Sequence, residues 1–366
     1  MKTLAACLVI KNESKVIDYC LSQVRPFVNQ IIVVDTGSTD NTIELVQNWA
    51  ERFGFEDYIS IISVGGKFHD ADGDFHFGDA KTFAMHQAST DYVLWMDAND
   101  VLVDPVAARN EFDRLVNDGN EYYITMPTSL SPRFSYNRKR IVPRENAYVH
   151  GRVHEYIAVD PKLLHGHIQS QFNNQRNSPN LERNIKLLTK DWNEEKTPRT
   201  AFYIANTYRE MKDDTNALKW FTIRAYTPEW KGIFHEEHYK ALECVAELSL
   251  PLYKDKKISK GDFFDICEDM INLDKTRPEG YFYMGELYLH TQQYKKALDY
   301  LSNYSKCKIP QNPCLWLDRR IYKEKIMGRR IQYCEMAIKN STVLTPDEVY
   351  SAGGTESTYA VGNGQY

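Results

Sequence analysis

The strongest constraint on the fold is an alternation of buried strands and amphipathic helices in the first hundred residues. Four mostly apolar segments have the length and composition of strands: residues 4–10, which are continuously apolar, and residues 30–35, 59–64 and 92–96. Between them, residues 15–28 and 42–53 carry apolar side chains at helical spacing. Strands separated by helices form βαβ units, so we predict a mainly parallel α/β sheet for residues 1–180.

The second half of the chain changes to long amphipathic helices with a weak internal repeat. Residues 280–300 repeat, 80 positions later, the pattern of residues 201–220, and an alanine at the same place in each copy marks a close helix approach. This spacing is about twice the period of a tetratricopeptide-like helix pair, so we predict an all-α repeat domain over residues 181–340. Residues 341–366, rich in Gly, Ser and Thr toward their end, predict a disordered tail.

Composition narrows the possible function classes. With 45 Lys and Arg against 50 Asp and Glu, the net charge of −5 argues against a protein held to nucleic acid by bulk charge. No apolar run reaches 18 residues, so we predict no membrane span. The 7 cysteines are scattered, odd in number and form no C-x-x-C motif. This pattern favours a reducing compartment, and we predict a cytoplasmic protein.

Carboxylates follow two of the predicted strands. Asp35 and Asp97 each stand where a strand ends, and ligands of parallel sheets bind beyond the carboxyl ends of strands. Gly37 and Ser38 would let the backbone approach a ligand, although a plain turn with a helix N-cap explains the same string. Asp97 and Asp100 could hold Mg²⁺ or Mn²⁺, and a solvated acidic turn is the alternative.

A third cluster follows in the segment that ends at Glu155. Arg152 and His154 precede this Glu, and charged neighbours of that kind can set the protonation state of a general base. A surface ion pair is the alternative interpretation. His167 is a possible third metal ligand, although ordinary polar packing is the favoured interpretation of a single His.

Five motifs then occur in a fixed order along the chain. They are C-L-V-I-K-N-E at 7–13, V-V-D-T-G-S-T-D-N-T at 33–42, F-G-D-A-K at 77–81, W-M-D-A-N-D at 95–100 and V-H-E at 153–155. This set resembles family 2 glycosyltransferases of the GT-A fold. Residues 183–188, 202–208 and 277–279 are similar to the tetratricopeptide-containing branch of that family. The resemblance implies a Rossmann-like GT-A domain over residues 1–180, followed by the helical repeats.

The resemblance also implies roles for individual residues. The donor-binding residues would be Val9, Lys11, Asn12, Glu13, Asp35, Gly37, Ser38, Lys81, Asp97 and Arg152. A Mn²⁺ or Mg²⁺ ion would bind Asp97, Asn99 and His167. Asn99 departs from the family pattern, which has a second Asp at this place, and an amide brings no charge. Lys81 replaces the usual Arg, which keeps the charge near the diphosphate but loses bidentate geometry.

The implied reaction is sugar transfer from a nucleotide-sugar, most commonly a UDP-sugar, with inversion by single displacement. Glu155 is the first candidate for the base that deprotonates the acceptor, and Asp100 is the second. The basic residues between positions 133 and 152 would cover the diphosphate as a mobile lid.

Several alternatives stay open at this point. A non-catalytic GT-A scaffold with a helical binding surface is the main one, and a nucleotidyltransferase is disfavoured because residues 11–13 form no glycine-rich phosphate loop. The acceptor is open between a peptide or protein, a glycan and a modified nucleobase. A homodimer through the helices is also expected from the resemblance.

Overall fold

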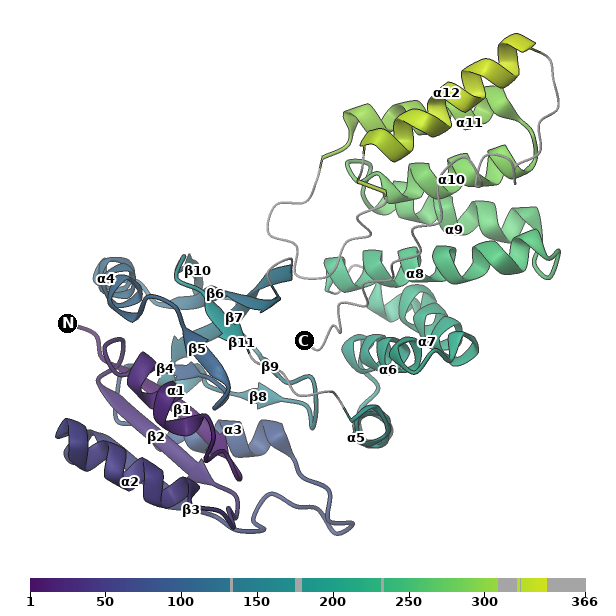
Figure 1. Cartoon of the computed structure of the whole chain (residues 1–366). Helices are drawn as coiled ribbons and strands as arrows, with labels where there is room; N and C mark the ends of the chain where they lie inside the picture. Colours follow the sequence, from purple (N-terminus) through teal and green to yellow (C-terminus); the bar gives the residue numbers. More distant parts are fainter. Residues whose placement is uncertain (132–133, 175–179, 232–233, 309–320, 323, 341–366) are drawn as a thin grey trace. The chain divides into compact units, whose positions relative to one another are not determined.

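The chain forms two compact units, Met1–Asp191 and a second that begins at Trp192 (Figure 1). The computed structural model describes residues 1–131, 134–174, 180–231, 234–308, 321–322 and 324–340. The boundary between the units falls within helix α5 (Leu181–Glu194). The predicted tail at 341–366 lies outside the described residues.

The first half of the sheet consists of four parallel strands: β1 (Leu4–Ile10), β2 (Gln30–Asp35), β3 (Ile59–Ser63) and β4 (Tyr92–Trp95). Their order is β3-β2-β1-β4. These runs lack charge until their last residues, which suits strands covered on both faces. The register pairs Ile10 with Asp35 and Cys7 with Trp95. The carboxyl ends of three strands therefore meet at one edge.

Helices cover both faces of this sheet. The helices of the first unit before α5 are α1 (Ile17–Val24), α2 (Thr42–Phe53), α3 (Phe77–His86) and α4 (Pro105–Val116). Apolar residues of α1, α2 and α4 share one core with the sheet, whereas α3 packs into a second core on the opposite face. Helix α2 runs from the carboxyl edge to Gly54, whose left-handed φ of 58° ends the helix. These helices fix the position of the strand ends.

The second half of the sheet is mixed. Its strands are β5 (Asp100–Leu102), β6 (Tyr122–Ser131), β7 (Phe134–Pro143), β10 (Leu164–His167) and β11 (Phe172–Asn174). Over the described residues, nine strands form one sheet, and β7 lies antiparallel between β4 and β6. The predicted mobile lid is therefore wrong for residues 134–143, because they are a central strand. Arg133 lies outside the described residues.

A small hairpin lies against α3. It consists of β8 (Val149–His150) and β9 (Tyr156–Ile157), which pair antiparallel. The loop of the β8–β9 hairpin contains the predicted V-H-E motif.

Short 3₁₀ turns in the described chain are η1 (Glu56–Tyr58), η2 (Arg144–Asn146), η3 (Pro228–Trp230) and η4 (Asn303–Lys306).

The second unit is a stack of antiparallel helices. They are α6 (Pro198–Glu210), α7 (Asp214–Tyr226), α8 (His235–Lys254), α9 (Lys260–Leu273), α10 (Glu279–His290), α11 (Tyr294–Ser302) and α12 (Glu324–Asn340). The two predicted repeat copies fall on α6–α7 and α10–α11. Side-chain caps start α6, α7 and α9. All regular elements described after Trp192 are helices, which confirms the all-α prediction. None of the described helices is long and apolar enough to cross a membrane.

Candidate active site

The loop after β2 is built around the carboxylate of Asp35. Its Oδ2 accepts a hydrogen bond from Gly37 N at 3.2 Å, and its Oδ1 accepts one from Ser38 N at 3.0 Å. Gly37 has a φ of 103°, a conformation that favours glycine. Asp35 is 5% exposed, so its first role here is to shape the turn.

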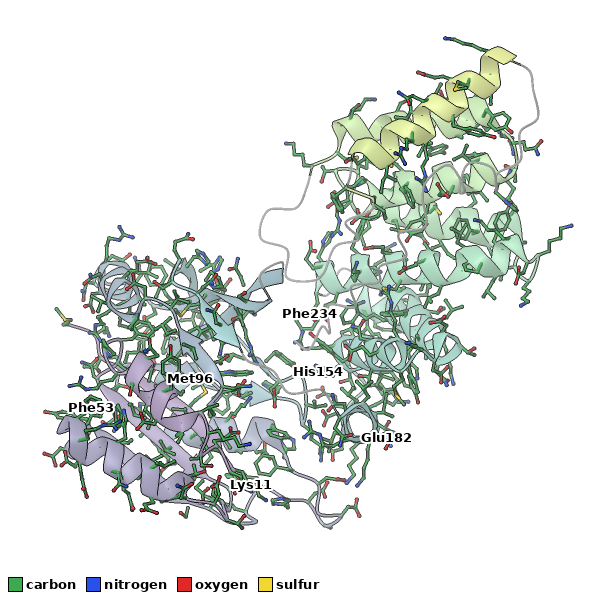
Figure 2. The ribbon with its side chains drawn as sticks, in the orientation of Figure 1. Lys11, Phe53, Met96, His154, Glu182 and Phe234 are labelled. Carbon is green, nitrogen blue, oxygen red and sulfur yellow. The ribbon has the colours of Figure 1, made fainter. Side chains whose placement is uncertain are left out.

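The loop after β1 is tied to this turn. Asn12 donates its backbone N–H to Ser38 Oγ at 2.9 Å and accepts from Thr39 N at 2.7 Å. Glu13 N donates to Thr42 Oγ1 at 2.8 Å. Figure 2 labels Lys11 at this carboxyl edge. The predicted donor residues that follow β1 and β2 are thus brought together, while Val9 lies within β1.

Asp97, two residues beyond β4, is faced by two cations. Lys81 Nζ from α3 lies 3.1 Å from Asp97 Oδ1, and Arg138 Nη1 from β7 lies 3.8 Å from Oδ2. Lys81 Nζ also lies 3.5 Å from Glu155 Oε2. Lys81 Nζ and Arg138 Cζ each stand 4.2 Å from the ring centroid of Trp95. The indole therefore supports two cations that converge on one carboxylate.

The surrounding charges change the titration of this cluster. Burial alone would raise the pKa of Asp97, but Lys81, Arg138 and Arg140 outweigh it and hold that pKa well below its usual range. Burial raises the pKa of Glu13, and the carboxylates of Asp97 and Asp40 add to the effect. Asp97 is consequently ionised at neutral pH while its side chain stays 35% exposed.

Asp100, the second candidate for the base, has a different environment. Its Oδ2 lies 2.5 Å from Arg140 Nη1, and both side chains are fully buried. The same oxygen accepts a hydrogen bond from Asp97 N at 3.0 Å. Asp100 therefore fixes the turn that presents Asp97 and has no access to an acceptor.

Close backbone packing places Lys81. A Cβ on Gly78 would lie 2.7 Å from the carbonyl oxygen of Gly151, so only glycine permits this approach. Gly78 N donates to that oxygen at 3.0 Å, and Val149 N donates to Thr82 Oγ1 at 2.9 Å. Helix α3 is thus fixed to the β8–β9 hairpin on both sides of Lys81.

The backbone of the β8–β9 hairpin loop turns sharply just before Glu155. Gly151 and His154 adopt left-handed backbone angles, with φ of 93° and 55°. Arg152, a predicted donor ligand, is 7% exposed and pairs with Asp191 at 2.6 Å. Arg152 therefore contributes to the shape of this loop, whereas Glu155 faces Lys81.

The predicted metal ligands do not form a complete cation site. Both Asp97 oxygens face cations, Asn99 supplies no charge, and His167 Nδ1 lies 3.0 Å from Thr125 Oγ1. The sheet order puts β10, which carries His167, three strands from β4, about 14 Å at usual spacing. Among the described residues, the carboxylates of Asp70, Asp72 and Asp74 lie close enough together to hold one metal ion.

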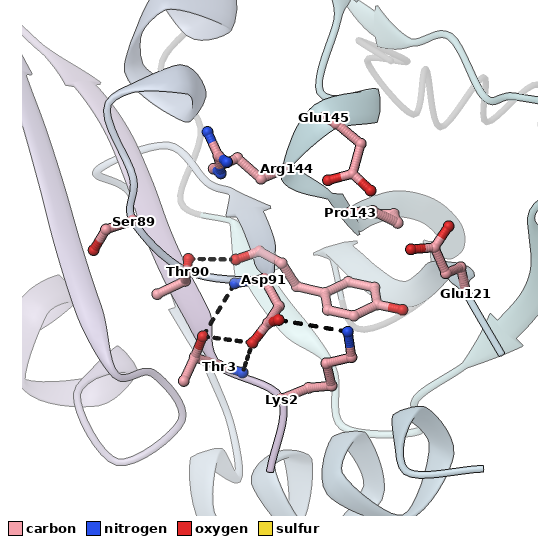
Figure 3. Close-up of a pocket in the computed structure, with 10 residues that line it drawn as sticks. Lys2, Thr3, Ser89, Thr90, Asp91, Glu121, Pro143, Arg144 and Glu145 are labelled. Carbon is pink, nitrogen blue, oxygen red and sulfur yellow. Dashed lines mark hydrogen bonds and ion pairs between the residues drawn. The ribbon is translucent and has the colours of Figure 1, made fainter. Parts of the chain in front are cut away.

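An open hollow of about 340 Å³ lies at the opposite, amino edge of β1 and β4 (Figure 3). Asp91 there accepts hydrogen bonds from Thr3 N and Thr3 Oγ1, each at 2.8 Å, and pairs with Lys2. This hollow contains none of the residues of the five motifs. We therefore place the candidate active site at Asp97 and not at the hollow.

Sequence reasoning assigned Arg138 and Arg140 to a lid over the diphosphate and not to positions beside the turn at 97–100, and it gave Trp95 no role of its own. A signal was present, because Arg138 and Arg140 are two residues apart and residues at that spacing share one face of a strand. Once residues 134–143 are known to be β7 beside β4, both guanidinium groups reach the turn at 97–100.

The chain is similar in sequence to known glycosyltransferases. Residues 6–126 match the model of the family "Glycosyl transferase family 2". The SPbeta prophage-derived glycosyltransferase SunS of Bacillus subtilis is 24% identical over 291 residues, which cover 73% of this chain and 63% of the relative. A TPR repeat-containing protein of Synechococcus elongatus is 26% identical over 103 residues, 28% of this chain and 22% of the relative. The chain thus spans less than two thirds of these relatives.

Among solved structures, S. aureus TarS 1–349 is similar with a TM-score of 0.39 and 10% identity, over 84% of this chain and 90% of that one. The family-model match confirms the resemblance to family 2 glycosyltransferases for residues 6–126. The described structure confirms the predicted fold class as an α/β unit followed by a helical unit.

Proposed function

We propose that the chain transfers a sugar from a nucleotide-sugar, with a UDP-sugar as the leading donor, to an acceptor nucleophile. One observation carries the proposal. The ammonium of Lys81 lies 3.1 Å from Asp97 and 3.5 Å from Glu155 at the carboxyl edge where the family 2 motifs meet. A cation between two carboxylates suits a reaction in which a phosphate leaves while a proton is removed.

The proposed reaction is a single displacement that inverts the anomeric carbon. Glu155 takes the proton of the acceptor nucleophile, whose electron pair forms the new bond to the anomeric carbon. The bond between that carbon and the diphosphate oxygen breaks, and its electron pair leaves with the nucleotide. Lys81 and Arg138 stabilise the developing charge, and Asp97 keeps both cations oriented. Because Asp97 already orients Lys81 and Arg138, these two cations need no rearrangement during the step.

The predicted Mn²⁺ or Mg²⁺ does not enter this mechanism. Both oxygens of Asp97 face Lys81 or Arg138, and among the described residues no group of three His, Cys, Asp or Glu ligand atoms within reach of one ion includes Asp97, so the ligand set does not fit a tightly held ion. Donor binding measured with and without Mn²⁺ tests this part of the proposal.

Three further features belong to the proposal. The acceptor is a peptide or protein, a glycan or a modified nucleobase, which transfer assays with each class would separate. The cysteine pattern supports a cytoplasmic location. We also expect a homodimer, which sedimentation of the purified chain would reveal.

A thermal-shift panel of UDP, GDP, CMP and dTDP, each with and without Mn²⁺, is the direct test. A nucleotide at 100 times its dissociation constant stabilises a fold by about 2.7 kcal/mol. A shift with one nucleotide, followed by turnover of its sugar conjugate, supports the proposal and names the donor. No shift with any nucleotide would favour the non-catalytic scaffold.

A further inference from the structure

Helix α5 holds the hairpin loop that presents Glu155. Asp191 Oδ2 accepts a hydrogen bond from Arg152 N at 3.0 Å, and its Oδ1 accepts one from Arg152 Nη1 at 2.6 Å. The two side chains are 8% and 15% exposed. A bidentate contact to both the backbone and the guanidinium fixes the direction of the chain at Arg152, three residues before Glu155.

The same helix holds the loop that leads into α3. Lys190 Nζ lies 2.8 Å from both Asp70 Oδ2 and Asp72 Oδ2 and also pairs with Asp74. Lys186 Nζ lies 2.7 Å from Asp74 Oδ1. The hydrogen bond from Lys190 is the main cause that lowers the pKa of Asp70 to about 2. Lys190 thus occupies the centre of the three-carboxylate cluster.

Both segments lead to the pair that performs the proposed chemistry. The 70–74 loop precedes His76, whose side chain caps α3 at Asp79 N, and α3 carries Lys81. The hairpin loop carries Glu155. The contact between Lys81 and Glu155 spans 3.5 Å, and α5 holds the two segments that lead to this pair in addition to the direct hydrogen bonds between α3 and the hairpin.

We propose that Asp191 is a positioning residue of the transferase, assisted by Lys190. It acts through Arg152 to hold Glu155 at its distance from Lys81, and it touches neither substrate nor reacting atoms. This inference rests on the proposed function. A misplacement of about 1 Å at a reacting group can cost about 100-fold in rate, so a remote clamp of this kind has a measurable effect.

The test compares Asp191→Asn and Asp191→Glu with wild type in the full-length chain. Glu182→Gln, an exposed carboxylate on the same helix, is the matched control. Asp191→Asn should lower kcat about 10- to 100-fold and leave the donor Kd within about threefold. Asp191→Glu should recover part of the loss, and Glu182→Gln should behave as wild type. An unchanged kcat per folded molecule, or an equal loss of donor binding, would overturn the inference.

Amide hydrogen exchange gives a readout that needs no turnover. Asp191→Asn should speed exchange of residues 149–155 and leave the core strand β2 unchanged. Exchange at the wild-type rate would overturn the positioning role even in an active transferase. If the wild-type chain transfers sugar from no nucleotide-sugar, the proposed function fails instead, and the two failures are distinguishable.

Discussion

The open site around Asp97 and the buried network around Arg277 use charged residues in opposite ways. At the carboxyl edge of the sheet, Asp97 stays one third exposed and its cations stand 3.1 and 3.8 Å away. Between the helices of the second unit, Arg277 lies 2.5 Å from Glu279, with side chains 3% and 0% exposed. Open, loosely paired charges can exchange their partners for a ligand. Closed pairs cannot, so their removal should affect folding more than chemistry.

The buried network of the helical unit is extensive. Glu279 also accepts hydrogen bonds from Tyr239 at 3.3 Å and Tyr322 at 2.6 Å, and Arg277 reaches Glu236 at 3.1 Å. These contacts join α8 to α10 and to the segment before α12. Each polar group satisfies another, which is the condition for keeping charges inside a protein.

The largest expected effect is at the open site. Asp97→Ala should lower kcat/KM by at least about 10³-fold, because Lys81 and Arg138 lose the carboxylate that orients them. Steady-state kinetics with the donor found in the thermal-shift panel would measure it. Asp57→Asn, an exposed carboxylate on η1, is the control. Near-normal activity of Asp97→Ala would remove Asp97 from the site.

The next effect separates chemistry from binding within the same site. Glu155→Gln should lower kcat by about 10²- to 10⁴-fold, as expected for the loss of a general base, because the amide cannot take the acceptor's proton. The donor Kd, measured by titration calorimetry, should change little because Lys81 remains in place. A loss of donor binding would show that Glu155 is not the base.

The helical unit should respond in stability. Arg277→Met leaves Glu279 buried without its guanidinium partner and should lower the free energy of unfolding by about 3–5 kcal/mol. Urea denaturation measures the change, and kcat per folded molecule should stay unaltered. The double variant Arg277→Met/Glu279→Gln removes both charges and should regain part of the loss. A change in kcat without a change in stability would break the contrast between the two units.

The comparison also shows what a sequence can predict. Strands β1, β2 and β4 were predictable because the interior of a buried parallel strand is an apolar run, and β3, at the edge of the sheet, keeps a mostly apolar sequence. The positions of Asp35 and Asp97 followed from the ends of those runs. The partners of Asp97 did not follow, because Arg138 reaches it through β7, which is paired with β4 across a long stretch of sequence.

Burial of charge was equally hidden from the sequence. In the sequence, Asp97 and Asp100 are both acidic residues that follow a predicted strand. In the structure, Asp100 is fully buried with Arg140, whereas the side chain of Asp97 is 35% exposed. Adjacent strand positions point to opposite faces, but the turn at 97–99 interrupts that alternation. Pattern alone therefore could not decide which carboxylate was available for chemistry.

The smallest expected effect is the contribution of one buried carboxyl of the helical unit to the pH dependence of stability. Burial raises the pKa of Glu243 to about 7, with Glu279 adding to the rise and Lys240 and Arg277 opposing it. In the unfolded chain a Glu titrates near about 4.3, so between these values the folded state holds a proton that the unfolded state has lost. The contribution of Glu243 to stability is therefore complete below that lower value and declines as pH rises toward 7. Glu243→Gln removes this titration, so the melting temperature of wild type should fall relative to the variant from pH 5 to pH 7.5. Parallel melting-temperature curves for the two proteins would mean that Lys240 keeps Glu243 ionised over this pH range. The buried pairs of the helical unit would then be charged like Asp97 at the open site, and they would differ from it only in their access to solvent.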